Sequence, residues 1–155
     1  MEDVRKNMTK NVIYFSPDET IGAAHTMMRH FNIRHLPIVR DGELQGIISD
    51  RDILRETQQY KDLNYIPEKR LIEIMNTQVL TCSHRNSISQ AAELMLTATI
   101  DCLPVVDDEN QLVGIITSSD ILRLVANSEN YVEKPIPFQW KLISSEDSRS
   151  QMAMN

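Results

Sequence analysis

Apolar residues in the first half of the chain follow two periods, and each period predicts a different kind of element. Spacings of three and four residues predict an amphipathic helix whose buried face holds Ile21, Ala24, Met28 and Phe31. Short β-branched or aromatic runs predict strands at residues 12–15, 36–39 and 44–49. A further helix begins where the last strand ends. The order of the elements is therefore strand, helix, strand, strand, helix.

Polar residues between these segments predict the caps and turns. Residues 16–19, Ser-Pro-Asp-Glu, are typical of a capping box with proline at the first helical position, and Thr20 is an equally good helix cap. Asp41 and Gly42 are typical of a tight hairpin turn between the second and third strands. Each unit is thus expected to hold a three-stranded sheet with two helices on one face.

The whole pattern returns in the second half of the chain. Met8 aligns with Met75 and Asp52 with Asp120, and the turn of the second copy, at 107–110, is one residue longer. The buried helical face returns at Ile88, Ala91, Met95 and Ala98. The chain is therefore a tandem duplication. Because such a sheet cannot bury its second face alone, we expect the two copies to pack sheet to sheet.

The duplication sets the expected domains. They are a first unit at residues 4–58, a linker at 59–70, a second unit at 71–126 and a C-terminal tail at 127–155. Residues 67–75 predict a short helix that begins at Pro67. In the tail, the largely apolar segment 138–140 is expected to be covered by a second copy of the chain, and the polar end, 144–155, is expected to be disordered.

The candidate chemistry lies in a stretch that occurs once in each copy, at 46–55 and again at 114–123. In each copy a buried strand ends in a hydroxyl, Ser49 or Thr117, and a carboxylate follows three residues later, Asp52 or Asp120. A helix N-terminus offers unpaired N–H groups and the positive end of the helix dipole. The hydroxyl and the carboxylate are therefore candidates to bind the phosphate and the ribose of a nucleotide. The alternative is that the carboxylates only provide favourable charge on a first helical turn.

Composition and charge narrow the function classes. The 155 residues include 16 basic and 22 acidic ones, a net charge of −6, which argues against non-specific nucleic-acid binding. No apolar run approaches the roughly 20 residues of a membrane helix, and the N-terminus lacks the apolar core of a signal peptide. Cys82 and Cys102 form no close pair, and the histidines have no metal-ligand spacing, so no metal site is indicated. Because neither a signal peptide nor a disulfide framework is indicated, we expect a cytoplasmic protein. No nucleophile–base pair can be named, so we do not expect an enzyme.

The repeated segments closely resemble a tandem pair of cystathionine-β-synthase (CBS) domains, the Bateman module. The shared signature is a Gly-apolar-apolar-Ser/Thr-x-x-Asp turn, an Ile-x-x-Leu-Pro strand before it and a Met-Thr-like start, and it occurs twice. The resemblance implies an α/β (α+β) fold of two β-α-β-β-α units, packed sheet to sheet around a pseudo-twofold axis. It also implies two clefts between the units, which in such proteins often bind AMP, ADP, ATP, S-adenosylmethionine or NAD.

The same resemblance implies roles for particular residues. Asp52 and Asp120 would hold the ribose hydroxyls, and Ser49 and Thr117 would reach the phosphate. The backbone near Ile13 and Leu80 would line the adenine. Arg34 and His35 occupy a position where some adenylate-sensing members keep basic residues for phosphate, whereas the second copy has Asp101 and Cys102 there. Because a carboxylate beside a phosphate lowers affinity and a guanidinium raises it, we expect two unequal sites.

Two functions remain open at this point. The first is a non-catalytic adenine-nucleotide sensor that needs no fixed cofactor, forms a homodimer and regulates a separate, unidentified protein. The second is a structural or dimerisation module whose clefts are degenerate or empty. Neither function involves nucleic acid or a membrane.

Overall fold

The computed structural model describes residues 3–58 and 66–128. The elements of the first half are α1 (Val4–Asn7), α2 (Ile21–Phe31), β1 (His35–Arg40), β2 (Glu43–Ser49) and α3 (Asp50–Thr57). Those of the second half are the 3-10 turn η1 (Leu71–Glu73), β3 (Cys82–Ser83), α4 (Ile88–Ala98), β4 (Cys102–Val106), β5 (Leu112–Thr117) and α5 (Ser118–Ala126). The predictions for residues 138–140 and 144–155 lie outside the described residues.

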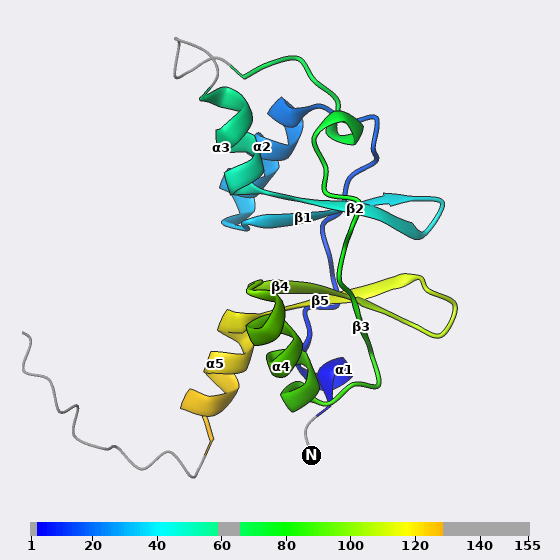
Figure 1. The fold of residues 1–155 in the computed structure, drawn as a ribbon, viewed down its shortest axis with the longest axis vertical. Coiled ribbons are helices and arrows are strands. Elements are labelled where there is room, and N and C mark those ends of the chain that lie inside the picture. Colours follow the sequence, from blue (N-terminus) through cyan, green and yellow to red (C-terminus); the bar gives the residue numbers. More distant parts are fainter. Residues whose placement is uncertain (1–2, 59–65, 129–155) are drawn as a thin grey trace, which may run out of the picture.

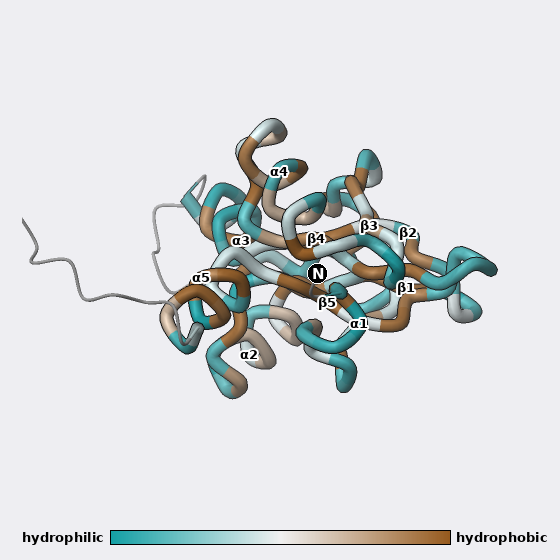
Figure 2. The backbone as a smooth tube through the Cα atoms, turned by 90° about the horizontal axis from the view of Figure 1, so that it is seen from below, coloured by the Kyte–Doolittle hydropathy of each residue, from teal (hydrophilic) through white to brown (hydrophobic). Residues whose placement is uncertain are grey.

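The two sheets face each other at the centre of the molecule, and the helices lie outside them (Figure 1). Helices α2 and α3 cover the sheet of the first copy, and α4 and α5 cover the sheet of the second. The predicted mixed α/β fold of two units packed sheet to sheet is therefore confirmed. Hydrophobic residues are concentrated in the strands, and the hairpin tips are hydrophilic (Figure 2).

Each central hairpin is antiparallel, and its register places predicted site residues side by side. His35 lies opposite Ser49 in the first hairpin, and Cys102 lies opposite Thr117 in the second. The first turn is closed by Asp41 and Gly42, both with positive φ (52° and 85°), as an Asp-Gly turn requires. The strand ends that lead into α3 and α5 therefore lie beside the starts of β1 and β4.

The predicted strand at residues 12–15 is wrong in extent. Only Phe15 pairs with the sheet: its N–H donates to the carbonyl of Pro37 over 3.0 Å, and its carbonyl accepts from the N–H of Val39 over 2.8 Å. The segment begins at the other sheet, where Thr9 and Ile115 exchange two hydrogen bonds of 2.9 and 3.0 Å. Because it crosses from one unit to the other, only its last residue lies beside β1. In the second copy the corresponding segment pairs over Cys82–Ser83.

The structure decides between the two helix caps proposed for α2. Thr20 is the cap, because its hydroxyl accepts from the N–H of Ala23 over 3.2 Å. The capping box at residues 16–19 is therefore wrong: the hydroxyl of Ser16 accepts from the N–H of Asp18 over 3.3 Å, and these residues form a turn. Pro17 precedes the helix by several residues.

The helix predicted from Pro67 is reduced to the single 3-10 turn η1. The backbone of residues 69–71 is hydrogen-bonded to residues at the start of α2 and just before it. The carbonyl of Lys69 accepts from the N–H of Ile21 over 3.0 Å, and the N–H of Leu71 donates to Glu19 over 2.8 Å. These long-range bonds fix residues 69–72 in a conformation that leaves no room for a regular helix.

The two units exchange the segments that precede them. Val4 and Met8 pack into the core of the second unit, whereas Leu71 and Met75 pack into the core of the first. Accordingly α1 lies beside α4, and the turn η1 lies beside the first sheet (Figure 1). At Gly46, a Cβ atom would lie 2.8 Å from the sulfur of Met75, so a glycine is needed there. The cores are therefore interlocked, although the sequence repeats are consecutive.

Candidate functional site

The repeated hydroxyl and carboxylate form a capping box at the start of α3 and of α5. In the first copy the Ser49 hydroxyl accepts from the N–H of Asp52 over 3.3 Å, and the Asp52 carboxylate accepts from the N–H and the hydroxyl of Ser49 over 2.8 and 2.6 Å. Thr117 and Asp120 form the same bonds over 3.3, 2.9 and 2.7 Å. The spacing of three residues thus has a structural role in both copies.

The capping box leaves part of each carboxylate for a ligand. One oxygen, Oδ2, holds the cap. The other, Oδ1, accepts from Arg55 over 3.2 Å in Asp52, and from Arg123 over 3.1 Å in Asp120. An ionised carboxylate has about four acceptor positions, so one remains for a ribose hydroxyl. The hydroxyl of Ser49 already donates its proton to Asp52, so it would have to rotate before it could donate to a phosphate.

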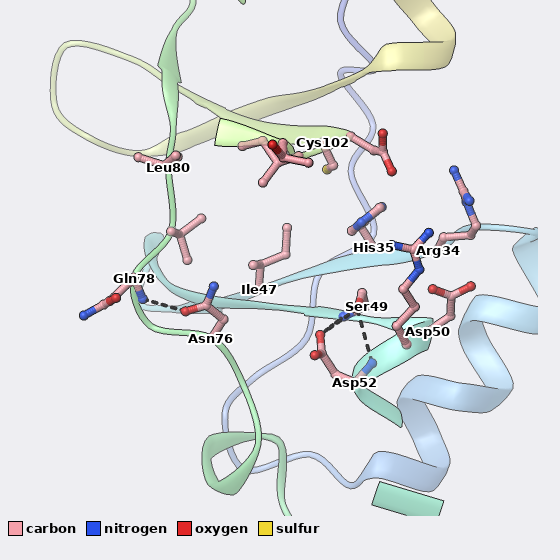
Figure 3. Close-up of a pocket in the computed structure, with 15 residues that line it drawn as sticks. Arg34, His35, Ile47, Ser49, Asp50, Asp52, Asn76, Gln78, Leu80 and Cys102 are labelled. Atoms are coloured by element: carbon pink, nitrogen blue, oxygen red, sulfur yellow. Dashed lines mark hydrogen bonds between the residues drawn. The ribbon is translucent and has the colours of Figure 1, made fainter. Parts of the chain in front are cut away.

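Each capping box lies in a cleft completed by the other unit. The Asp52 cleft has a volume of about 270 Å³ and is lined by Ser49, Asp52 and, from the second copy, Leu80. Figure 3 shows Ser49 and Asp52 on one side of this cleft and Leu80 on the opposite side. The Asp120 cleft, of about 290 Å³, is lined by Thr117, Asp120 and, from the first copy, Ile13. The structure therefore brings together six predicted site residues in two matching sets.

Arg34 and His35 are not confined to one cleft. They belong to the first copy, and Asp101 and Cys102 hold the same positions in the second copy. In the structure Arg34, His35 and Asp101 line both clefts, and Cys102 lines the Asp52 cleft. The reason is the face-to-face packing of the sheets, which places the starts of β1 and β4 between the two clefts. The basic and acidic residues are therefore shared by the two clefts, and the expectation of two unequal sites stays a prediction.

The duplicated fold and its two clefts correspond to a known family. The model of the CBS domain matches residues 1–58 and 71–127. The chain belongs to the CBS domain family. The CBS domain-containing protein YhcV of Bacillus subtilis is 36% identical to it over 122 residues, which cover 78% of this chain and 84% of YhcV. Other relatives are longer, and the chain spans 22% of one of them and 45% of another.

Solved CBS structures share this fold. The CBS domain pair of protein MJ0100, in complex with 5′-methylthioadenosine and S-adenosyl-L-methionine, has 35% sequence identity and a TM-score of 0.73, and covers 81% of this chain and 97% of that one. CBSX2 in complex with AMP has 26% identity and a TM-score of 0.70, with the same coverage of 81% and 97%. Both of these CBS structures therefore contain adenosine ligands.

Several residues of the CBS clefts are missed by the sequence analysis. The Asp52 cleft is also lined by Asn76 and Gln78, and the Asp120 cleft by the corresponding Thr9 and Asn11. The backbone N–H of Gln78 donates to the Asn76 side chain over 3.0 Å, which fixes this amide in place (Figure 3). The available signal was a run of three polar residues at the start of both repeats, 9–11 and 76–78, directly before the apolar run begins.

Burial shifts the pKa of two side chains that line the CBS clefts, His35 and Cys102. Burial, together with the neighbouring Arg34, lowers the pKa of His35 below 6.5, although nearby carboxylates oppose this. His35 is therefore neutral at pH 7, and Arg34 is the permanent cation of the pair. Burial raises the pKa of Cys102 to about 12, so this thiol is no nucleophile at neutral pH.

Residues 3–58 and 66–128 hold neither a metal-binding cluster nor a membrane-spanning helix. In these residues there is no group of three or more His, Cys, Asp or Glu side chains that could hold a metal ion. They also form no helix with the length and apolar character needed to cross a bilayer.

Proposed function

We propose that this CBS pair is a non-catalytic regulatory module that binds an adenosine compound in one or both clefts and acts in trans on a separate, cytoplasmic partner protein. The observation that carries the proposal is the composition of the clefts. Each joins a carboxylate at a helix start, Asp52 or Asp120, to an apolar residue of the other unit, Leu80 or Ile13. Such a cleft offers a charged acceptor and an apolar surface on opposite sides.

The two sides of the cleft match the two parts of adenosine. The carboxylate accepts from one ribose hydroxyl at its remaining acceptor position, as a charge-assisted hydrogen bond. The adenine lies against Ile47 and Leu80 in the Asp52 cleft, and against Ile13 and Ile115 in the Asp120 cleft. A ligand in either cleft contacts both units, so its binding changes how firmly the units hold together. That change is the signal that a partner protein can read.

The shared adenosine group explains why several ligands are candidates: AMP, ADP, ATP, S-adenosylmethionine and NAD. The MJ0100 and CBSX2 complexes support adenosine compounds as the class. The test is a thermal-shift screen with these compounds and with adenosine, followed by calorimetry. A ligand at 100 times its Kd stabilises by about 2.7 kcal/mol, which raises the Tm by about 5–11 °C for a chain of this size. No shift and no heat with any of them would refute the proposal.

The alternative function, a dimerisation module with empty clefts, is favoured by the outer face of the helices. Leu96 and Leu122 are 81% and 67% exposed, and Leu54 and Val125 are exposed as well. Helix α5 is a largely hydrophobic segment at the edge of the molecule (Figure 2). We expect a second copy of the chain to cover this face. Light scattering should give twice the chain mass, and Leu122→Glu should give the single mass. A dimer that binds no adenosine compound would favour the alternative.

A further inference from the structure

The two clefts share one wall, formed by the residues just before β1 and β4. The carbonyl of Arg34 accepts from the N–H of Asp50 over 3.0 Å, and the carbonyl of Asp101 accepts from the N–H of Ser118 over 2.9 Å. These bonds tie each of the two residues to the first turn of the helix that begins with the capping box of its own unit. Both then line both clefts.

The charged residues of this shared wall serve both clefts, whereas other arginines line one cleft each. Arg51 lines only the Asp52 cleft, and Arg123 lines only the Asp120 cleft. His35 is shared but neutral at pH 7, because burial lowers its pKa. Among the described residues, Arg34 is therefore the permanent cation that both clefts have in common. Its counterpart by duplication, Asp101, is an anion that both clefts have in common.

We propose that Arg34 couples the two clefts negatively for adenosine ligands that carry phosphate. This inference rests on the proposed function, since it requires that adenosine compounds bind. A phosphate bound in one cleft takes the charge of the guanidinium. The other cleft then presents Asp101 without the shared cation and keeps only its own arginine, Arg51 or Arg123, so it binds a second phosphate more weakly. Adenosine itself carries no charge, so it fills the two clefts independently.

The size of the effect can be set by comparison with other coupled sites. Coupling between two binding sites is typically 5- to 150-fold in affinity. Two anionic ligands that share one cation fall within this range, and we expect about tenfold. The consequence for a sensor is mixed occupancy, with a phosphate-bearing ligand in one cleft and an uncharged or cationic adenosine compound in the other.

The coupling can be measured with two variants that each block one cleft. Arg51 and Ser119 occupy the same position of the two repeats, both are exposed, and each lines one cleft only. Arg51→Trp should fill the Asp52 cleft, and Ser119→Trp the Asp120 cleft, and each variant should bind a single adenosine. Calorimetry with AMP then gives the association constant of each cleft alone. The coupling factor is the product of the two wild-type association constants divided by the product of these single-cleft constants.

For AMP the coupling factor should be about 0.1, and for adenosine about 1. In Arg34→Gln the factor for AMP should rise several-fold towards 1. The matched control is Arg51→Gln, which removes a cation from one cleft only: it should weaken AMP in that cleft and leave the factor near 0.1. A factor for AMP equal to that for adenosine, or one that Arg34→Gln leaves unchanged, would overturn the inference.

Failure of this inference is distinguishable from failure of the proposed function. If only one of the two blocked variants binds AMP, the clefts differ intrinsically, so the coupling is refuted while the proposed function stands. If the wild type binds one AMP although both blocked variants bind one each, the coupling is stronger than tenfold and the inference holds. If adenosine and AMP bind nowhere, both ideas fail together.

Discussion

The carboxylate of Asp52 has two tasks in this structure, and Asp52→Asn separates them. It closes the cap of α3 through Ser49, and it is the proposed ribose acceptor of its cleft. The variant keeps one carbonyl oxygen and the size of the side chain, but it loses the negative charge and one acceptor atom. It should therefore lower both the stability of the free protein and its affinity for adenosine, by amounts that can be worked out in turn.

The stability loss follows from the capping box. Loss of a helix cap costs about 0.5–2 kcal/mol. The ion pair with Arg55 adds little, because that arginine side chain is 72% exposed. The helix-dipole effect alone would be only about 0.3–1 kcal/mol. We therefore expect a loss of about 1–2 kcal/mol, and the Tm of the free protein should fall by about 2–8 °C.

The binding loss is assigned to the ribose by a comparison of two ligands. Removal of a charge-assisted hydrogen bond costs about 1.5–3 kcal/mol, so adenosine should bind about 10- to 100-fold more weakly. The ligand 2′,3′-dideoxyadenosine lacks the hydroxyls and should bind wild type and Asp52→Asn alike. Calorimetry in the Ser119→Trp background isolates the Asp52 cleft.

The matched control for Asp52→Asn is Ser49→Ala. It removes the hydroxyl of the same capping box but keeps the carboxylate, so it should lower the Tm by a similar amount and leave the affinity for adenosine nearly intact. Equal losses for adenosine and the dideoxy ligand would refute the reasoning, because the carboxylate would then act on the shape of the cleft and not on the ribose.

Three further predictions follow from packing and from the pKa values. Gly46→Ala should lose about 1–3 kcal/mol in urea unfolding, because its Cβ would lie 2.8 Å from the Met75 sulfur and 3.0 Å from a backbone oxygen; Gly22→Ala, with its nearest atom at 3.9 Å, should lose nothing. Cys102, whose pKa burial raises to about 12, should react with Ellman's reagent only as fast as the protein unfolds, and rapid labelling of the native state would contradict this. Burial lowers the pKa of His35 below the unfolded value of 6.5, so the unfolded chain takes up this proton first: His35 should contribute full stability above that pH and lose it as the pH falls towards the folded pKa. His35→Gln should flatten this part of the curve of unfolding free energy against pH, and an unchanged slope would count against the assignment.

The features that the sequence predicted well are those set by neighbouring residues. The Asp41–Gly42 turn needs positive φ at two adjacent positions, and few residue pairs other than Asp-Gly supply them so readily. The hydroxyl and carboxylate of Ser49 and Asp52 meet because they lie three residues apart at a helix start. The apolar period of α2 selects the buried face that holds Ile21, but Phe31, assigned to the same face, is 50% exposed. Each of these depends on a handful of consecutive residues, so the sequence is enough.

The features that it predicted poorly depend on partners far away in the chain. Residues 12–15 have the composition of a strand, but Thr9 is held by Ile115, so the segment must cross to the other sheet. The helix expected from Pro67 fails because the backbone of Leu71 is bonded to Glu19. No local property shows these pairings. The sequence held one clue to the exchange of leading segments, a glycine and a methionine at matching positions of each copy. It does not show which methionine packs against which glycine.

The shared wall between the clefts shows why a duplicated site cannot be understood one copy at a time. Alignment pairs Arg34 with Asp101, and the natural reading is one basic and one acidic cleft. The pseudo-twofold packing instead places both residues at both clefts, so a change in either one alters two sites at once. Two arginines there would set like charges against each other, and two aspartates would do the same. Both residues also act on the charge state of His35, one lowering its pKa and the other raising it, which places them around the same ring. An arginine in one copy and an aspartate in the other therefore cancel each other's charge on the shared wall when no ligand is bound. A phosphate that pairs with the arginine leaves the charge of the aspartate uncancelled, and this weakens phosphate binding in the neighbouring cleft.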